Sequence, residues 1–96
     1  MIKTFKGQGT EDLFNGVDTK VARRTCDQRV WPTAKRRLDL LDAAKDLRDL
    51  RGTGLSLESL KHDKPGFHAI RISDKYRIVF RMEHGDVYEV EVTDYH

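Results

Sequence analysis

The sequence predicts one α+β domain over residues 1–96, in which two N-terminal helices pack on one face of a mainly antiparallel, twisted sheet of four or five strands. A length of 96 residues fits a single small domain. The first half contains an amphipathic helical pattern, because Ala34, Leu38 and Leu41 recur at spacings of four and three. The second half alternates in short segments separated by turn residues, which is typical of antiparallel strands.

The first elements are a strand and a short helix. Residues 2–5 alternate and predict a strand that ends at a Gly-Gln-Gly turn. This order does not indicate a dinucleotide site, because Asp12 occupies the position of the third glycine of that motif. A short helix is expected from an N-cap at Thr10 to Phe14, with Gly16 as its C-terminal stop.

The main helix is expected from near Asp27 to Ala44, after a polar link over residues 17–24. Pro32 is compatible with this helix only in or near its first turn. A further helical turn is expected over residues 45–50, where leucines recur at a spacing of three.

The strands of the second half are expected to form two hairpins after an alternating piece at residues 55–60. Three-residue loops at 73–75 and 84–86 would place one apolar row against the helix: Ile70, Ile72, Tyr76, Ile78, Phe80, Tyr88, Val90 and Val92. The opposite face would then carry Ala69, Arg71, Arg77, Val79, Arg81, Glu89 and Glu91. In this register Arg81 lies opposite Glu89, and Val79 lies opposite Glu91.

The formal net charge of +2 conceals a segregation of charge along the chain. Residues 20–37 hold seven Lys or Arg and one acid, whereas residues 83–94 hold five acids and no Lys or Arg. A second basic block, over residues 71–81, holds four Lys or Arg and one acid. Such blocks suggest a polyanionic partner such as nucleic acid. Charge alone leaves the alternative of a merely solvated helix face open.

The cysteine count and the hydropathy of the chain indicate its cellular compartment. The single Cys26 excludes an internal disulfide and fits a reducing compartment. The sequence has no apolar run long enough for a membrane helix or a signal peptide, and Met1 to Phe5 is typical of the start of a domain. We expect a cytoplasmic protein without membrane contact. The four scattered histidines show no zinc-ligand spacing, so no metal or small-molecule cofactor is expected.

A strand over residues 87–93 leads to three ionisable side chains, Asp94, Tyr95 and His96. A chain end is often frayed, which gives one interpretation. The other is an active-site corner that the sheet holds in place.

Four stretches resemble the HigB branch of the RelE/ParE toxin superfamily: residues 1–5, Leu60-Lys61 with Asp63, residues 76–80, and Asp94-Tyr95-His96. The resemblance implies a RelE/ParE-like fold and a toxin of a type II toxin–antitoxin system. It further implies a ribosome-dependent mRNA endonuclease that inhibits translation and growth, with the ribosome (16S rRNA) and mRNA as partners. A HigA-like helix-turn-helix antitoxin is expected to silence it.

Metal-independent RNA cleavage uses the ribose 2′-hydroxyl as nucleophile and requires a base, an acid and cations around the phosphate. His96 is the candidate acid, because its charge changes near neutral pH. Tyr95 is a candidate for stacking or positioning the phosphate, and Asp94 for orienting the imidazole. Lys61 and Arg77 are candidates for electrostatic stabilisation. Glu58 stands where similar ribonucleases commonly carry a histidine, and it is the candidate base.

Further cations are candidates for RNA and phosphate contacts: Arg71, Arg81, Arg23, Arg24, Arg29, Lys35, Arg36 and Arg37. The alternative function is a non-cleaving inhibitor, either of DNA gyrase as in ParE-type toxins or of the ribosome. The grouped Asp94, Tyr95 and His96 favour cleavage, whereas Glu58 favours the alternative.

Overall fold

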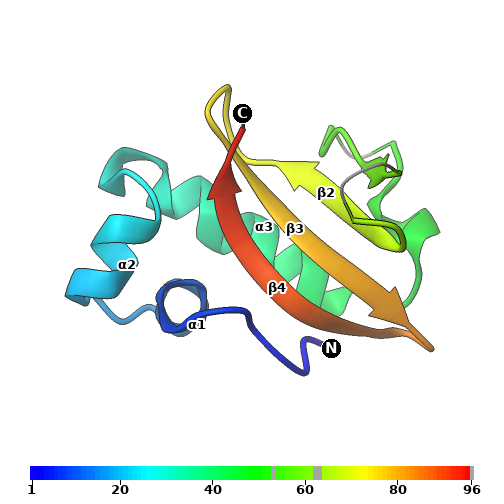
Figure 1. The fold of residues 1–96 in the computed structure, drawn as a ribbon, viewed down its shortest axis with the longest axis horizontal. Helices are drawn as coiled ribbons and strands as arrows, with labels where there is room; N and C mark the ends of the chain where they lie inside the picture. Colours follow the sequence, from blue (N-terminus) through cyan, green and yellow to red (C-terminus); the bar gives the residue numbers. More distant parts are fainter. Residues whose placement is uncertain (53, 62–63, 96) are drawn as a thin grey trace.

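The structure is a computed structural model, which describes residues 1–52, 54–61 and 64–95. Four strands of the described residues form one antiparallel sheet in the order β1-β2-β3-β4, with bounds Glu58–Leu60, Phe67–Arg71, Tyr76–Glu83 and Asp86–Asp94. Helix α3 (Trp31–Ala43) crosses behind the sheet, and α1 (Gln8–Asn15) and α2 (Lys20–Thr25) lie beside its β4 edge (Figure 1). The α+β class with helices on one face of an antiparallel sheet is confirmed.

Helix α1 starts earlier than expected. It begins at Gln8 after Gly7, and Gly16 ends it in the left-handed conformation, as expected of a helix stop. Thr10 is not its N-cap. The Thr10 side chain is buried, and its hydroxyl accepts the backbone N–H of Val92 at 3.0 Å, which ties α1 to β4.

The expected polar link contains a helix that the sequence analysis missed. Thr19 caps α2 by accepting the N–H of Ala22 at 3.1 Å, and Ala22 is fully buried. The main helix is correspondingly shorter at its start. Asp27 caps a separate 3₁₀ turn, η1 (Gln28–Val30), so α3 begins only at Trp31, with Pro32 in its first turn.

After α3 the chain makes the further turn that the leucine spacing predicts. It is a 3₁₀ turn, η2 (Leu47–Leu50), which Asp46 and Asp49 stabilise as a capping box. Leu50 is buried, as expected.

Residues 2–5 do not form a full strand. They run beside β4 and make two isolated parallel bridges, from Ile2 to Val87 and from Phe5 to Val90. Backbone hydrogen bonds from Lys3 to Val87 (2.7 Å) and from Lys6 to Val90 (2.9 Å) hold this segment in place. The prediction of a regular first strand is therefore wrong. The segment nevertheless covers the edge of β4.

The first hairpin has the expected register, because Arg71 pairs with Arg77 around the loop at residues 73–75. The second hairpin differs. Its turn has two residues, and the register shifts between Val79 and Arg81, so Arg81 pairs with Tyr88 rather than Glu89. Glu89 has a φ of 54°, which marks it as the extra residue of a β-bulge. Val79 pairs with Glu91 as expected.

The bulge changes which side chains face α3. Val87 is fully buried in the core, whereas Tyr88 lies on the outer face. The guanidinium carbon of Arg81 lies 4.7 Å from the centre of the Tyr88 ring. The prediction that Tyr88 faces the helix is thus wrong. The fully buried core side chains include Phe80, Leu38, Leu41, Leu50, Ile70, Ile78, Val87 and Val90. Within the described residues, no helix has the length and apolar character needed to cross a bilayer.

Candidate functional site

The face of the sheet that points away from α3 carries the candidate site. Strand pairing aligns Arg71, Arg77 and Thr93 in one row across β2, β3 and β4. In the next row, Glu58 of β1 pairs with Ala69. Side chains on one face of a sheet recur every second residue. These two adjacent rows therefore place Arg71 and Arg77 near the Glu58 carboxylate of the edge strand β1.

Arg77 lies at the centre of this group. Its side chain is 21% exposed, and one terminal nitrogen lies 3.6 Å from the Glu58 carboxylate. The Tyr95 ring centre is 5.1 Å from the guanidinium carbon, which is within cation–π range. The Nε–H of Arg77 is buried and has no hydrogen-bond partner among the described residues. The guanidinium is therefore held from two sides and keeps one donor unused.

A hollow of about 300 Å³ opens beside this cluster, lined by Ser56, Glu58, Arg71, Asp74 and Tyr95. Arg71 forms an ion pair with Asp74 of the following turn, and its carbonyl accepts a hydrogen bond from Arg37 of α3. The lining of the hollow thus combines one arginine with two carboxylates and a phenol, and Arg77 contacts two of the lining residues, Glu58 and Tyr95. This combination can bind a phosphate diester and place a base and a stacking ring beside it.

Two of the hollow's lining residues were missed from the sequence. Ser56 has a φ of 54° in the segment before β1, and Asp74 lies in the β2–β3 turn. Asp74 stands three residues after Arg71, which is the signal that could have found it.

The structure does not bring all predicted catalytic residues together. Asp94 pairs with Tyr76, whose side chain is buried in the core, so alternation places Asp94 on the face opposite Tyr95. Lys61 is exposed and directly follows Leu60, which pairs with Phe67 at the end of β1 away from the hollow. His96 lies outside the described residues.

Arg81, farther along β3, is engaged with acids. It forms ion pairs with Glu83 and, at 3.3 Å, with Glu89, and the hydrogen bond to Glu89 contributes most to raising the pKa of Arg81. These exposed pairs reduce the charge that Arg81 presents to a phosphate.

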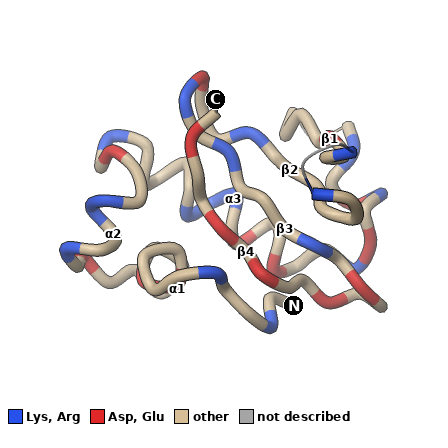
Figure 2. Tube along the Cα trace, in the orientation of Figure 1, with Lys and Arg blue, Asp and Glu red and all other residues tan. Residues whose placement is uncertain are grey.

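The basic residues of the helices fall into two groups. Figure 2 shows Lys and Arg along α2, at the side of the molecule away from β1, and along α3, which runs behind the sheet. Three cations of residues 20–37 have acidic partners: Arg23 with Asp18, Arg29 with Asp27 and Lys35 with Asp39, each at 2.7 Å. No described carboxylate pairs with the other four, Lys20, Arg24, Arg36 and Arg37.

The fold matches solved structures of bacterial toxins. One chain of a YoeB–YefM complex from Staphylococcus aureus superposes with a TM-score of 0.61 at 16% identity, covering 100% of this chain and 98% of that chain. A YoeB/ParE toxin from Agrobacterium tumefaciens superposes with a TM-score of 0.55 at 16% identity, covering 98% and 99%. The fold is therefore of the YoeB/ParE toxin class.

Sequence comparison places the chain within this class. The family model described as RelE-like toxin of type II toxin–antitoxin system HigB matches residues 3–96. The Endoribonuclease HigB of Proteus vulgaris is 33% identical over 97 residues, which cover 100% of both chains. The chain belongs to the HigB-like family of RelE-like toxins, as the resemblance of its motifs predicted.

Proposed function

We propose that this chain is a ribosome-dependent mRNA endonuclease that cleaves at a ribose 2′-hydroxyl without a catalytic metal. The observation that carries the proposal is the cluster of Glu58, Arg77 and Tyr95 beside a hollow on the outer face of the sheet. The whole-length match to a relative named as an endoribonuclease supports RNA as the substrate class. Arginine suits this substrate because its planar fork binds phosphate oxygens in pairs.

In the proposed mechanism, the phosphate enters the hollow and accepts hydrogen bonds from the terminal N–H groups of Arg77, beside Glu58, and from Arg71. Glu58, released from Arg77 by the phosphate, accepts the 2′-hydroxyl proton. The 2′-oxygen attacks phosphorus, and the bond from phosphorus to the 5′-oxygen breaks. His96 donates a proton to the departing 5′-oxygen. The products are a 2′,3′-cyclic phosphate and a 5′-hydroxyl.

The remaining candidates have supporting roles. Tyr95 is proposed to stack on a base next to the scissile phosphate, since its aromatic side chain lines the hollow. Asp94 is proposed to orient His96 rather than to contact the phosphate, because its pairing with Tyr76 places it on the other face. Lys61 is proposed to contact the RNA backbone beyond β1. Arg71, which lines the hollow, is proposed to contact the RNA backbone there.

Partners follow from the family and from the surface charge. We propose a HigA-like antitoxin as the neutralising partner, because the family is a toxin–antitoxin family. A similar chain is seen in a YoeB–YefM complex. The basic residues of α2 and α3 are proposed to contact 16S rRNA in the ribosome. A cytoplasmic location is consistent with this partner.

One observation favours a non-cleaving inhibitor as the second candidate. Glu58 replaces the histidine that similar ribonucleases commonly carry, and its ion pair with Arg77 offsets the charge that a phosphate would meet. A protein of this kind would bind the ribosome or another target without cutting RNA.

The two candidates are distinguished by translating a defined mRNA in the presence of the protein and mapping cut sites by primer extension. We expect codon-located cuts with wild type and none with His96→Ala. His84→Asn, which changes an exposed turn histidine, serves as the matched control and should cut like wild type. Growth arrest without cuts, or equal cutting by His96→Ala, would contradict the catalytic proposal.

A further inference from the structure

We propose that Tyr76 is a positioning residue of the candidate site, whose hydroxyl anchors the start of β3 to the α2–η1 corner and thereby fixes Tyr95 over Arg77. This inference rests on the proposed function, because Tyr76 does not itself line the hollow and would act on cleavage through Tyr95.

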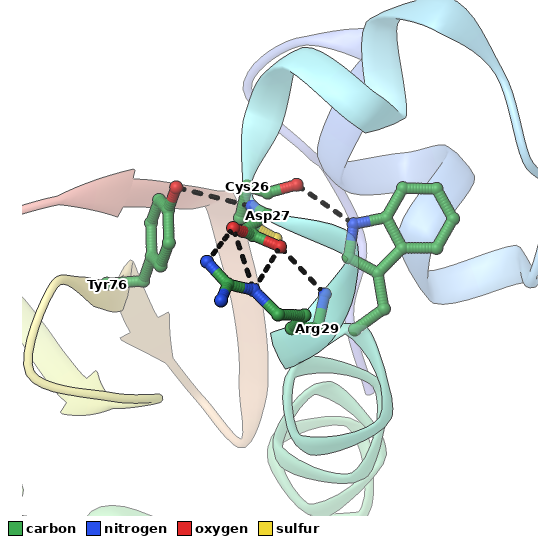
Figure 3. Close-up of polar contacts among 5 residues, drawn as sticks. Cys26, Asp27, Arg29 and Tyr76 are labelled. Atoms are coloured by element: carbon green, nitrogen blue, oxygen red, sulfur yellow. Dashed lines mark hydrogen bonds and ion pairs between the residues drawn. The ribbon is translucent and has the colours of Figure 1, made fainter.

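The anchoring contact joins distant parts of the chain. Tyr76 is only 9% exposed, and its phenolic oxygen accepts the backbone N–H of Asp27 at 3.2 Å, across 49 positions of sequence. Figure 3 shows the Tyr76 side chain reaching from the sheet to the segment that carries Cys26 and Asp27. The hydroxyl therefore links the helical layer to the first residue of β3.

The corner that receives this contact is itself fixed. The Asp27 carboxylate accepts the Arg29 backbone N–H at 2.9 Å and forms an ion pair with the Arg29 guanidinium at 2.7 Å. These hydrogen bonds from Arg29 lower the pKa of Asp27 to about 2, so the carboxylate stays ionised at neutral pH. The indole N–H of Trp31 donates to the Cys26 carbonyl at 3.0 Å. Asp27 thus presents its N–H from a backbone held on both sides.

On the sheet side, Tyr76 controls the turn that holds Tyr95. The Tyr76 carbonyl accepts the N–H groups of Ile72 and Ser73, at 2.9 and 3.1 Å, which closes the turn. Tyr76 pairs with Asp94, and the carbonyl of the preceding Lys75 accepts the Tyr95 N–H at 2.8 Å. The Tyr95 backbone is therefore attached to a turn whose end is fixed by the Tyr76 hydroxyl.

The consequence for chemistry is geometric. The Tyr95 ring lies 5.1 Å from the Arg77 guanidinium, so a shift of the strand end moves the ring relative to the cation that is proposed to hold the phosphate. A misplacement of about 1 Å from a change outside the reacting groups can lower a rate by up to about 10²-fold. Removing the hydroxyl while keeping the ring isolates this effect from core packing.

The test compares Tyr76→Phe with wild type in single-turnover cleavage of mRNA on programmed ribosomes, at a range of ribosome concentrations. We expect the maximal rate to fall by about threefold to tenfold, the factor that corresponds to one buried neutral hydrogen bond. The half-saturating ribosome concentration should not change, because no residue that docks on the ribosome is altered.

A second readout does not require activity. Amide hydrogen exchange measured by NMR should show faster exchange of the Tyr95 N–H in Tyr76→Phe, with the core amides of Ile78 and Phe80 unchanged. Tyr88→Phe is the matched control, because it removes the same hydroxyl group from a tyrosine whose ring packs against Arg81 and not against the corner. It should leave Tyr95 exchange and the maximal rate at wild-type values.

Three results would overturn the proposal: unchanged Tyr95 exchange, an equal rise in exchange at Ile78 and Phe80, or faster Tyr95 exchange with an unchanged maximal rate. A wild-type protein that does not cut mRNA would instead contradict the proposed function. The exchange measurement alone would then decide whether Tyr76 fixes Tyr95.

Discussion

Arg77 joins the parts of the candidate site, because its guanidinium lies between the Glu58 carboxylate and the Tyr95 ring. The Nε–H of Arg77 is buried without a described partner, which is unfavourable, so the terminal N–H groups are the donors that a phosphate can reach. A lysine at this position would keep the charge but lose the fork that binds two phosphate oxygens.

We therefore expect Arg77→Lys to lower the single-turnover cleavage rate by about 10²-fold, the usual effect of removing a donor to a developing charge. Arg48→Lys is the matched control, since Arg48 is exposed on η2 and pairs with Asp46 outside the site. Cleavage by Arg77→Lys at the wild-type rate would remove Arg77 from the mechanism.

The Cys26 thiol is expected to react slowly, because its surroundings raise its pKa. Burial, and next the nearby Asp27 carboxylate, raise the pKa of its thiol from 9.0 to about 11. The thiolate is the reactive form, and a raised pKa means that less of it is present at any pH below about 11. At pH 8 the folded chain should hold about 10²-fold less thiolate than an unperturbed cysteine.

The expected outcome is slow alkylation of Cys26 by iodoacetamide in the native protein and fast alkylation in denaturant, followed by mass spectrometry. Equal rates in the two conditions would show that the thiol is neither buried nor protonated in solution.

At the scale of elements, α1 and α2 pack closely through Gly9. A Cβ at this position would lie 2.0 Å from the Thr25 hydroxyl and 2.8 Å from the Val21 carbonyl oxygen. Both distances are shorter than atoms tolerate, and the second involves backbone that cannot rotate away. Gly9 is therefore required by the approach of the two helices, although glycine is a poor helix former.

Gly9→Ala should lower the free energy of unfolding by about 1 to 3 kcal/mol, as overpacking does, even though alanine favours a helix. Thr25→Ala in the same chain should recover part of this loss by removing the nearer atom. Denaturant unfolding checks both, with Asn15→Ala, at an exposed position of α1, as the control. A stabilised Gly9→Ala protein would contradict the packing.

The sequence predicts elements with local signals and misses those that depend on distant contacts. The stripe of Ala34, Leu38 and Leu41 and the alternation of β2 and β3 are local, and the structure buries the expected side chains. The bulge at Glu89 is invisible because Val87 and Tyr88 are both apolar, so either could face the core. Helix α2 was missed because its six residues bury little beyond Ala22.

The candidate site was likewise predicted only in part. Residue types and register indicated that Arg71 and Arg77 share a face, which strand pairing bears out. The position of Asp94 on the other face could not be predicted without the pairing of Tyr76 with the end of β4. The hydrogen bond between Asp27 and Tyr76 joins the helices to the sheet across 49 positions of sequence, so no local sequence pattern predicts it.

At the scale of the molecule, charge is distributed unevenly between strand β4 and the helices (Figure 2). Asp and Glu lie along β4, whereas Lys and Arg lie along α2 and α3 (Figure 2). Cations already paired with acids contribute less to binding a polyanion, since their charge is offset at short range. Neighbouring Arg23 and Arg24 differ in this respect, because Arg23 pairs with Asp18 at 2.7 Å.

Arg24→Gln is expected to weaken ribosome binding and to reduce the slope of log affinity against log salt by about 1, as loss of one phosphate contact does. Arg23→Gln should have a smaller effect on both quantities. Filter binding across a salt series measures them, and identical slopes for both variants and wild type would exclude α2 from the RNA-binding surface.

Cleavage at a 2′-hydroxyl on the ribosome is tested most directly with mRNAs that carry a single 2′-deoxynucleotide at the mapped cut position. Wild-type protein should cut the all-ribose mRNA on programmed ribosomes to give a 2′,3′-cyclic phosphate. It should leave the 2′-deoxy mRNA intact at that position, although both bind the ribosome equally. Cleavage of the 2′-deoxy mRNA at the same bond and rate would contradict the mechanism.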